Sequence, residues 1–242
     1  MTKITLIENT VRGAVRAIHK AITEDIPQDM RDKPLETYNA IAHRRGDFIN
    51  ENLRRLVVGV DVEMHSFKRN SWNGRILVDR RNKITYTVIT QASLRAILRN
   101  KNREKPHYLQ SILAVENGGY EGKMGQRSFF PEDTFDTRIL QKDYDRIVAG
   151  QINPSDGYQH YIIAYKSKQG ELQDVKLKFL DKDFNIVDMA SLNEHIKPDF
   201  ARLTDAAPLE GHAIDKPTEG SRSLVKLKAG IRPKLREVKK EA

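Results

Sequence analysis

Apolar and polar residues alternate along residues 59–90, and this alternation predicts a three-stranded antiparallel meander. In the first expected strand, Val60, Val62 and Met64 alternate with acidic and histidine side chains. A period of two residues is the spacing of a strand that buries one of its faces. Turn-forming residues at 70–74 and 80–82 separate the three strands. We therefore expect this meander to be the centre of the fold.

The same alternation predicts how the strands pair. Pairing about Trp72 sets His65 opposite Asp79, and the second turn sets Asp79 opposite Lys83. This register separates an apolar face from a polar face, whereas a slip of one residue would mix them. The apolar face would consist of Val60, Val62, Met64, Ile76, Val78, Ile84, Tyr86 and Val88.

Apolar residues at three- and four-residue spacing predict helices on both sides of the meander. The expected helices span 5–24, 34–57, 92–102, 136–149 and 190–197. Further strands are expected over 108–115 and 185–187, with a hairpin of 158–167 and 171–180. The sequence thus predicts an α+β fold in which mainly antiparallel sheets, the meander and the C-terminal hairpin, pack with helices.

The composition changes near residue 204. Residues 1–203 are expected to form one α+β globular domain, with a subdivision near 116–135 as the alternative. Residues 204–242 are rich in Pro, Gly, Ala and charged residues, a composition typical of a flexible, disordered tail. The whole chain has a formal net charge of +9, and residues 212–242 hold nine Lys and Arg against four Asp and Glu. This basic tail is expected to contact nucleic acid, or a protein partner through residues 221–242.

Several classes of protein and site are disfavoured by the composition. The absence of cysteine excludes disulfides, thiolate metal sites and cysteine nucleophiles. No apolar run approaches the ~20 residues that span a bilayer, and the polar N-terminal segment does not resemble a signal peptide. We expect a cytoplasmic protein that has no membrane association.

The polar face of the meander suggests a metal site. Asp61, Glu63 and His65 alternate along one strand and so project to one side, where the expected register adds Asp79 and Lys83. Carboxylate and imidazole groups bind divalent metals, and a lysine can stabilise developing negative charge. Asp61, Glu63, His65 and Asp79 are thus candidate metal ligands, and with Lys83 they are candidate catalytic residues. The alternative is a solvated sheet face with cross-strand ion pairs.

Trp72, the only tryptophan, indicates a different chemistry, because basic residues surround it in the sequence. Aromatic and basic side chains together suit stacking on unpaired bases. The expected nucleic-acid surface consists of Lys68, Arg69, Trp72, Arg75, Arg80, Arg81, Arg95 and Arg99. In the alternative, the indole ring folds back over its own hairpin.

The order of elements expected over 34–115, helix, three strands, helix, strand, resembles the core of the restriction-endonuclease-like nucleases. That resemblance implies an acidic residue on the second strand, which Asp79 matches, and an acid-x-lysine pair on the third. The third strand reads ITYTV and lacks the pair, so the resemblance implies a degenerate metal-dependent site. The segments RRGDFINENLRRL and KPHYLQSIL, together with the Trp72 hairpin, resemble uncharacterised proteins of unknown function from Gram-positive bacteria and their phages.

Three functions stay open at this point. The first is a nucleic-acid-associated binding protein of bacterial or phage origin. The second is a metal-dependent, nuclease-like hydrolase with a degenerate site, and the third is an interaction protein that docks through its C-terminal tail. The sequence does not decide whether the protein is an enzyme, and DNA is not distinguished from RNA.

Overall fold

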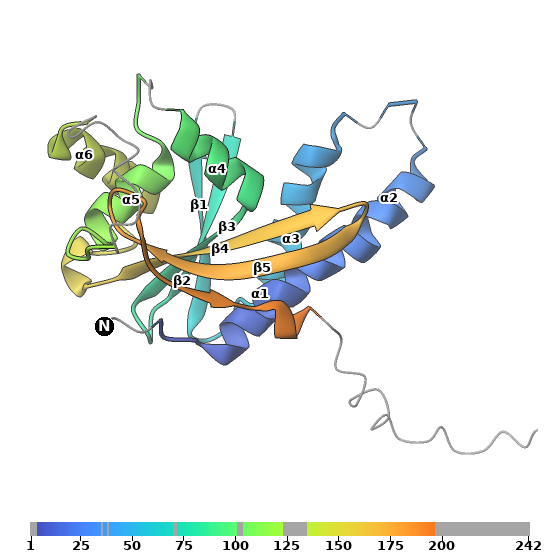
Figure 1. Cartoon of the computed structure of the whole chain (residues 1–242), viewed down its shortest axis with the longest axis horizontal. Helices are drawn as coiled ribbons and strands as arrows, with labels where there is room; N and C mark the ends of the chain where they lie inside the picture. The colour runs from blue at the N-terminus through green and yellow to red at the C-terminus, as the bar shows by residue number, and fades with distance from the viewer. Residues whose placement is uncertain are drawn as a thin grey trace, which may run out of the picture. The chain divides into compact units, whose positions relative to one another are not determined.

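The computed structural model describes residues 4–34, 36, 37, 39–69, 72–100, 104–122 and 135–196. Within this part of the chain, all six strands belong to one sheet, and helices cover both of its faces (Figure 1). The described residues belong to one unit of the chain, Met1–Pro198. The expected tail, most of the 116–135 stretch and its proposed subdivision lie outside the described residues.

The strands follow one another across the sheet in chain order. They are β1 (Val62–Arg69), β2 (Trp72–Asp79), β3 (Ile84–Thr90), β4 (Gln159–Lys168), β5 (Glu171–Leu180) and β6 (Ile186–Ser191). Every neighbouring pair is antiparallel except β3 and β4, which are parallel. The predicted α+β fold is confirmed, and the parallel pair joins the expected meander and the expected hairpin into a single sheet.

The register predicted for the meander is wrong. Arg69 pairs directly with Trp72, so the first turn is much tighter than expected, and His65 lies opposite Ile76. Asp79 lies opposite Val62 on one side and opposite Ile84 on the other. Trp72 belongs to the strand because an aromatic residue suits a pleated surface with a cross-strand neighbour.

This shift redistributes the apolar residues over both faces of the meander. Ile76 and Val78 turn to the face opposite Val62, Ile84 and Tyr86, and both faces are buried. Val60, expected in the apolar face, precedes β1 and is fully exposed. The predicted register assumed that only one face of the meander is buried. It therefore does not apply to this sheet, which is packed on both faces.

The first face of the sheet is covered by N-terminal helices. These are α1 (Glu8–Lys20), the π-helical turn η1 (Ala21–Asp25) and α3 (Ile41–Leu56), and α2 (Ile26–Asp32) packs on η1 and α3. Val11, Ala14, Val15 and Ile18 are fully buried, as the helical spacing predicts. The helix expected over 5–24 is present as α1 and η1, whereas the one expected over 34–57 begins only at Ile41.

The second face is covered by the connection between β3 and β4. This connection contains α4 (Gln91–Arg99), α5 (Tyr108–Glu116) and α6 (Thr137–Val148), at the upper left of Figure 1. Leu109, Ile112 and Leu113 of α5 pack with Ile162 and Ala164 of β4. No described helix is long and apolar enough to cross a membrane.

Two elements differ in kind from the prediction. The strand expected over 108–115 is the helix α5, and the helix expected over 190–197 is the end of β6 followed by a 3-10 turn, Asn193–His195. Because α5 is buried almost all round, its apolar run is too continuous to distinguish a helix from a buried strand. The element order on which the nuclease resemblance depends therefore fails at its last element.

Candidate binding groove at Trp72

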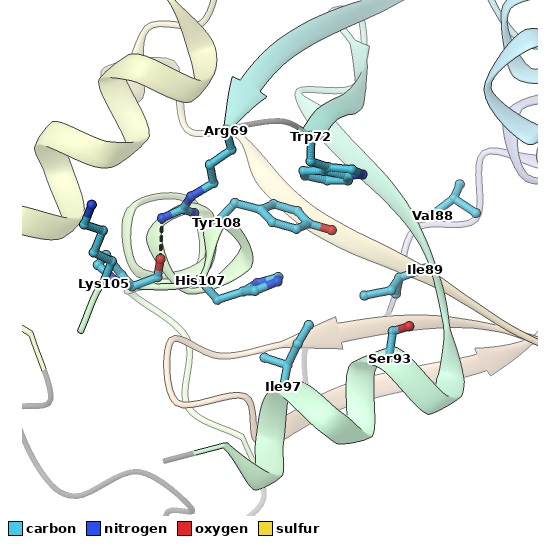
Figure 2. A pocket seen from close by; sticks show the side chains of 10 residues that line it. Arg69, Trp72, Val88, Ile89, Ser93, Ile97, Lys105, His107 and Tyr108 are labelled. Carbon is cyan, nitrogen blue, oxygen red and sulfur yellow. Dashed lines mark hydrogen bonds between the residues drawn. The ribbon is translucent and has the colours of Figure 1, made fainter. Parts of the chain in front are cut away.

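A groove opens on the second face of the sheet, where the β1–β2 hairpin, the end of β3, α4 and the start of α5 meet (Figure 2). Its volume of about 530 Å³ falls within the range typical of ligand sites. We call it the Trp72 groove. It is lined by Arg69, Trp72, Val88, Ile89, Ser93, Ile97, Lys105, Pro106, His107 and Tyr108.

Three aromatic rings form one wall of the Trp72 groove. The centroids of the Trp72 and Tyr108 rings are 5.3 Å apart, and those of His107 and Tyr108 are 4.4 Å apart. Figure 2 shows the rings in a row from Trp72 through Tyr108 to His107. Tyr108 is 8% exposed, whereas Trp72 is 47% exposed. The row thus has a buried middle and an accessible indole, which suits contact with a flat ligand.

Phe67 holds the indole in place from the strand side. Its ring packs edge to face on Trp72, with centroids 5.6 Å apart. Gly74 lies across from Phe67 on β2, and a Cβ atom there would lie 2.1 Å from the Phe67 ring. A side chain at position 74 is therefore incompatible with this ring position.

Arg69 lines the groove and joins the β1–β2 hairpin to the elements beside it. Its guanidinium donates a hydrogen bond to the Pro106 carbonyl, and its Nη1 atom lies 3.3 Å from Asp143 Oδ2 of α6. Asp143 also accepts a 2.6 Å hydrogen bond from Ser111 Oγ of α5. These contacts fix the β1–β2 hairpin against α5 and α6, so Arg69 both carries charge and positions the aromatic wall.

The charged residues that line the groove are all positively charged. Arg69 and the exposed Lys105 are cationic, and none of the ten lining residues is acidic. Burial raises the pKa of Tyr108, so its phenol stays neutral. The groove thus offers aromatic surface and the positive charge of Lys105, while the charge of Arg69 is paired with Asp143 behind the lining.

Two of the eight residues predicted to bind nucleic acid line the Trp72 groove, namely Arg69 and Trp72. Lys68 and Arg75 alternate with them along the strands and project to the opposite face. Arg95 and Arg99 are exposed on α4 outside the groove.

The remaining two arginines make ion pairs within the meander. Arg80 binds Glu63 through two hydrogen bonds of 2.8 Å, and Arg81 Nη1 lies 3.7 Å from Asp61 Oδ2. The hydrogen bond from Arg80 is the largest cause that lowers the pKa of Glu63. Both carboxylates are thus occupied by cross-strand and turn contacts, as the alternative of a solvated ion-paired face describes.

The expected catalytic cluster does not converge. Asp79 is 1% exposed and projects to the first face, whereas Glu63 and His65 project to the second. Asp79 closes the β2–β3 turn, because its two carboxylate oxygens accept hydrogen bonds from the Asn82 backbone and side chain, each 2.9 Å long. The predicted site included Asp79 because the register used for it was wrong.

The other members of that cluster lie in local contacts. His65 Nε2 lies 3.0 Å from Glu63 Oε2, and Lys83 Nζ lies 3.7 Å from Asp156 Oδ2 and 5.1 Å from the centre of the Tyr158 ring. Among the described residues, no three His, Asp or Glu side chains are placed to hold a metal ion. The geometry therefore offers no metal centre for the hydrolase hypothesis in this part of the chain.

A second polar cluster is sealed under α5 and α6. Glu116 is hydrogen bonded to Thr85 Oγ1 and accepts a 2.9 Å hydrogen bond from the Tyr144 hydroxyl. The ring nitrogens of His160 lie 2.7 Å from Thr85 Oγ1 and 3.0 Å from Thr87 Oγ1. Burial raises the pKa of Glu116 to about 7 and lowers the pKa of His160 to about 3. With every member buried, we assign this cluster to the fold rather than to a ligand.

Lys105, His107 and Tyr108 were not among the predicted site residues. They precede or begin α5, which was expected to be a strand. The available signal was Pro106, because proline marks a boundary between elements, although it does not distinguish a helix from a strand. In the structure His107 is the N-cap, and its Nδ1 atom accepts a 3.2 Å hydrogen bond from the Leu109 amide.

Comparisons with known proteins give a family and no activity. Neither the curated proteins nor the solved structures contain a match to the chain. A family model matches residues 3–242 and is described as a family of unknown function, DUF5986. This match confirms the expected relationship to uncharacterised proteins of unknown function. The chain belongs to the family of unknown function DUF5986.

Proposed function

We propose that this protein binds single-stranded nucleic acid and that unpaired bases stack in the Trp72 groove. One observation carries the proposal: an accessible indole continues into a row of aromatic rings beside cationic side chains. Every base has a π face, so such a row accepts bases with little dependence on their identity. A duplex hides these faces within its own stack, and single strands are therefore the expected ligand.

The charges of the groove support an anionic ligand. Lys105 lines the groove and is exposed, and it is the main source of this charge, because Arg69 is already paired with Asp143. Phosphates next to a stacked base would meet this positive potential, and the release of counterions would add to the affinity. The formal net charge of +9 acts in the same direction.

The hydrolase alternative has less support, because it requires acidic residues that converge. The described carboxylates of the meander are occupied by arginines or by a turn. Among the residues that the structure describes, the groove has no acidic lining residue, and the Nδ1 atom of His107 already accepts a backbone hydrogen bond. A binding role therefore fits the groove better than a hydrolytic role.

The only tryptophan of the chain lies in the groove, so its fluorescence reports on the site directly. Titration with a single-stranded oligonucleotide at low salt should quench this fluorescence, and the matching duplex should bind more weakly. Trp72→Ala should weaken binding by roughly 5- to 150-fold, which corresponds to the ~1–3 kcal/mol of one stacked base. Anisotropy of a labelled oligonucleotide measures this variant.

Trp72→Phe is the matched control, because it keeps an aromatic ring and should retain most of the affinity. Lys105→Gln should weaken binding and reduce the slope of log affinity against log salt by about 0.7, the value for one phosphate contact on a single strand. The proposal is abandoned if the protein ignores single strands at low salt, or if Trp72→Ala binds as the wild type does.

A further inference from the structure

The second face of the sheet continues beyond α4 on β5 and β6. On this face Lys176 lies across from Ala164 of β4, and Lys178 lies across from Ile162. Helix α4 packs against β3 and β4, and next to Lys178 on β6 the Met189 side chain is 44% exposed. The part of the sheet that carries the two lysines is therefore partly open to solvent.

Lys178 is a half-buried lysine whose close charged neighbours are mainly cations. Arg95 of α4 and Lys176 act on it with the same sign, and among the described residues Asp174 is the one acidic group that acts on it. Burial first, and then Lys176 and Arg95, lower the pKa of Lys178. Within the described part of the chain, no carboxylate lies at ion-pair distance from its Nζ atom.

Asp174 does not compensate this charge, because other groups already occupy its oxygens. It accepts hydrogen bonds of 2.7 Å from Gln91 Nε2 and 2.9 Å from Asn193 Nδ2, and Lys176 Nζ lies 3.6 Å from Oδ2. Asp174 is thus held by two amides and by Lys176, and it acts on Lys178 without a hydrogen bond or an ion pair. Such an arrangement is unfavourable in the free protein and becomes favourable when an anion joins it.

We propose that Lys178, Lys176 and Arg95 form a phosphate-binding site, which we call the Lys178 site. Resting on the proposed function, it would hold the backbone of the same single strand whose bases stack in the Trp72 groove. Arg95 is on the helix that supplies Ser93 and Ile97 to that groove. The two sites therefore lie on either side of α4, and a bound strand would cross this helix.

The residue types favour phosphate over a neutral ligand. Lys178 and Lys176 offer point charges that rotate freely, and Arg95 offers a planar fork that can bind two oxygens of one phosphate. Binding of an anion would also relieve the repulsion among the three cations. A neutral ligand would leave this repulsion in place.

Lys178→Met separates this role from a structural one, because the two predict opposite effects on stability. The substitution removes a half-buried charge from beside two cations and keeps an unbranched apolar side chain. The free protein should melt at the same temperature as the wild type or higher. Its affinity for a single-stranded oligonucleotide should fall about tenfold at low salt, the loss expected for one charge-assisted hydrogen bond.

Inorganic tripolyphosphate tests the site without any base. It should raise the melting temperature of the wild type in a concentration-dependent manner and have little effect on Lys178→Met. Lys33→Met is the control, because Lys33 is an exposed lysine at the C-cap of α2, among the N-terminal helices, and it should behave as the wild type in both assays. If Lys178→Met binds the oligonucleotide as tightly as the wild type does, the Lys178 site is overturned, whether or not the stability of the variant has changed.

The two proposals fail in different ways. If Trp72→Ala weakens oligonucleotide binding and Lys178→Met does not, the groove stands and the Lys178 site is rejected. If Lys178→Met abolishes the response to tripolyphosphate while Trp72→Ala binds the oligonucleotide normally, the site binds free polyphosphate and base stacking is rejected.

Discussion

The Phe67 ring occupies the space that a side chain of Gly74 would need, and the two residues face each other across β1 and β2. This relationship sets the height of the Trp72 indole above the sheet, because Phe67 packs edge to face on that ring. The groove therefore depends on a glycine at position 74, where no side chain displaces the Phe67 ring.

Gly74→Ala should therefore be destabilising and should weaken oligonucleotide binding. The new methyl group would displace the buried Phe67 ring, and overpacking of this kind costs typically ~1–3 kcal/mol. Urea unfolding measures the stability. Gly46→Ala in α3 is the control, because a Cβ atom there meets nothing within 4 Å. That variant should be more stable than the wild type by roughly 0.5–1 kcal/mol. Equal stability of Gly74→Ala and wild type would contradict the proposed support of Trp72.

The buried carboxyl of Glu116 should make stability fall between about pH 4.5 and pH 7. Its pKa is raised in the folded state, from 4.5 to about 7, and burial is the main cause. The unfolded chain loses this proton first as the pH rises, so the stabilisation is complete below pH 4.5 and lost by about pH 7. His160 acts in the opposite sense, because its lowered pKa makes the fold lose stability as the pH falls from 6.5 towards 3.

Glu116→Gln isolates the carboxyl from this opposing effect of His160. The stability of the variant relative to the wild type should increase by about 3 kcal/mol between pH 4.5 and pH 7.5, which is the free energy of the pKa shift. Urea unfolding at several pH values measures the difference. Glu171→Gln, at an exposed position of β5, should show no such trend. A difference that stays constant with pH would show that Glu116 is ionised in the fold.

Arg69→Lys should loosen the groove even though it keeps the charge. A lysine has a single nitrogen, whereas the guanidinium contacts the Pro106 carbonyl through Nη2 and Asp143 through Nη1. We expect a loss of about 1–2 kcal/mol in stability and a weaker response of Trp72 fluorescence to oligonucleotide. Lys68→Arg, on the opposite face of the same strand, should leave both unchanged. If Arg69→Lys keeps both the stability and the fluorescence response of the wild type, Arg69 contributes only its charge and does not position the aromatic wall.

Divalent metal ions provide a test of the hydrolase alternative. Mg²⁺, Mn²⁺ or Zn²⁺ should leave the melting temperature unchanged, because Asp79 faces away from Glu63 and His65. If metal ions raise the melting temperature of the wild type but not that of His65→Ala, the metal hypothesis is restored for the second face of the meander.

Local patterns predicted the elements better than their pairing. The apolar stripe that includes Val11 and Ile18 gave the first helix correctly, because its spacing depends only on neighbours in the chain. The strand register depends on where the first turn falls, and because turn-forming residues extend from 70 to 74, the composition does not show that the turn lies between Arg69 and Trp72. The helix α5 was mistaken for a strand because Leu109, Ile112 and Leu113 are buried among other apolar residues.

The site was predicted in part for the same reason. Trp72 and Arg69 are neighbours on one hairpin, so their association was visible in the sequence. Tyr108 and Lys105 reach the groove only through the long connection after β3, and Lys178 meets Arg95 only through the sheet. Arg80 seemed available for a ligand because its partner Glu63 lies on another strand.

The parallel pairing of β3 with β4 also has a consequence for the order of folding. These strands can pair only after the connection that carries α4, α5 and α6 has closed, and closure of so long a connection is slow compared with formation of a hairpin. The β1–β2 hairpin places Trp72 beside Phe67 early, whereas Tyr108 arrives with that closure. During refolding, the lone tryptophan should therefore report two successive events, and competence to bind a ligand should appear only with the second.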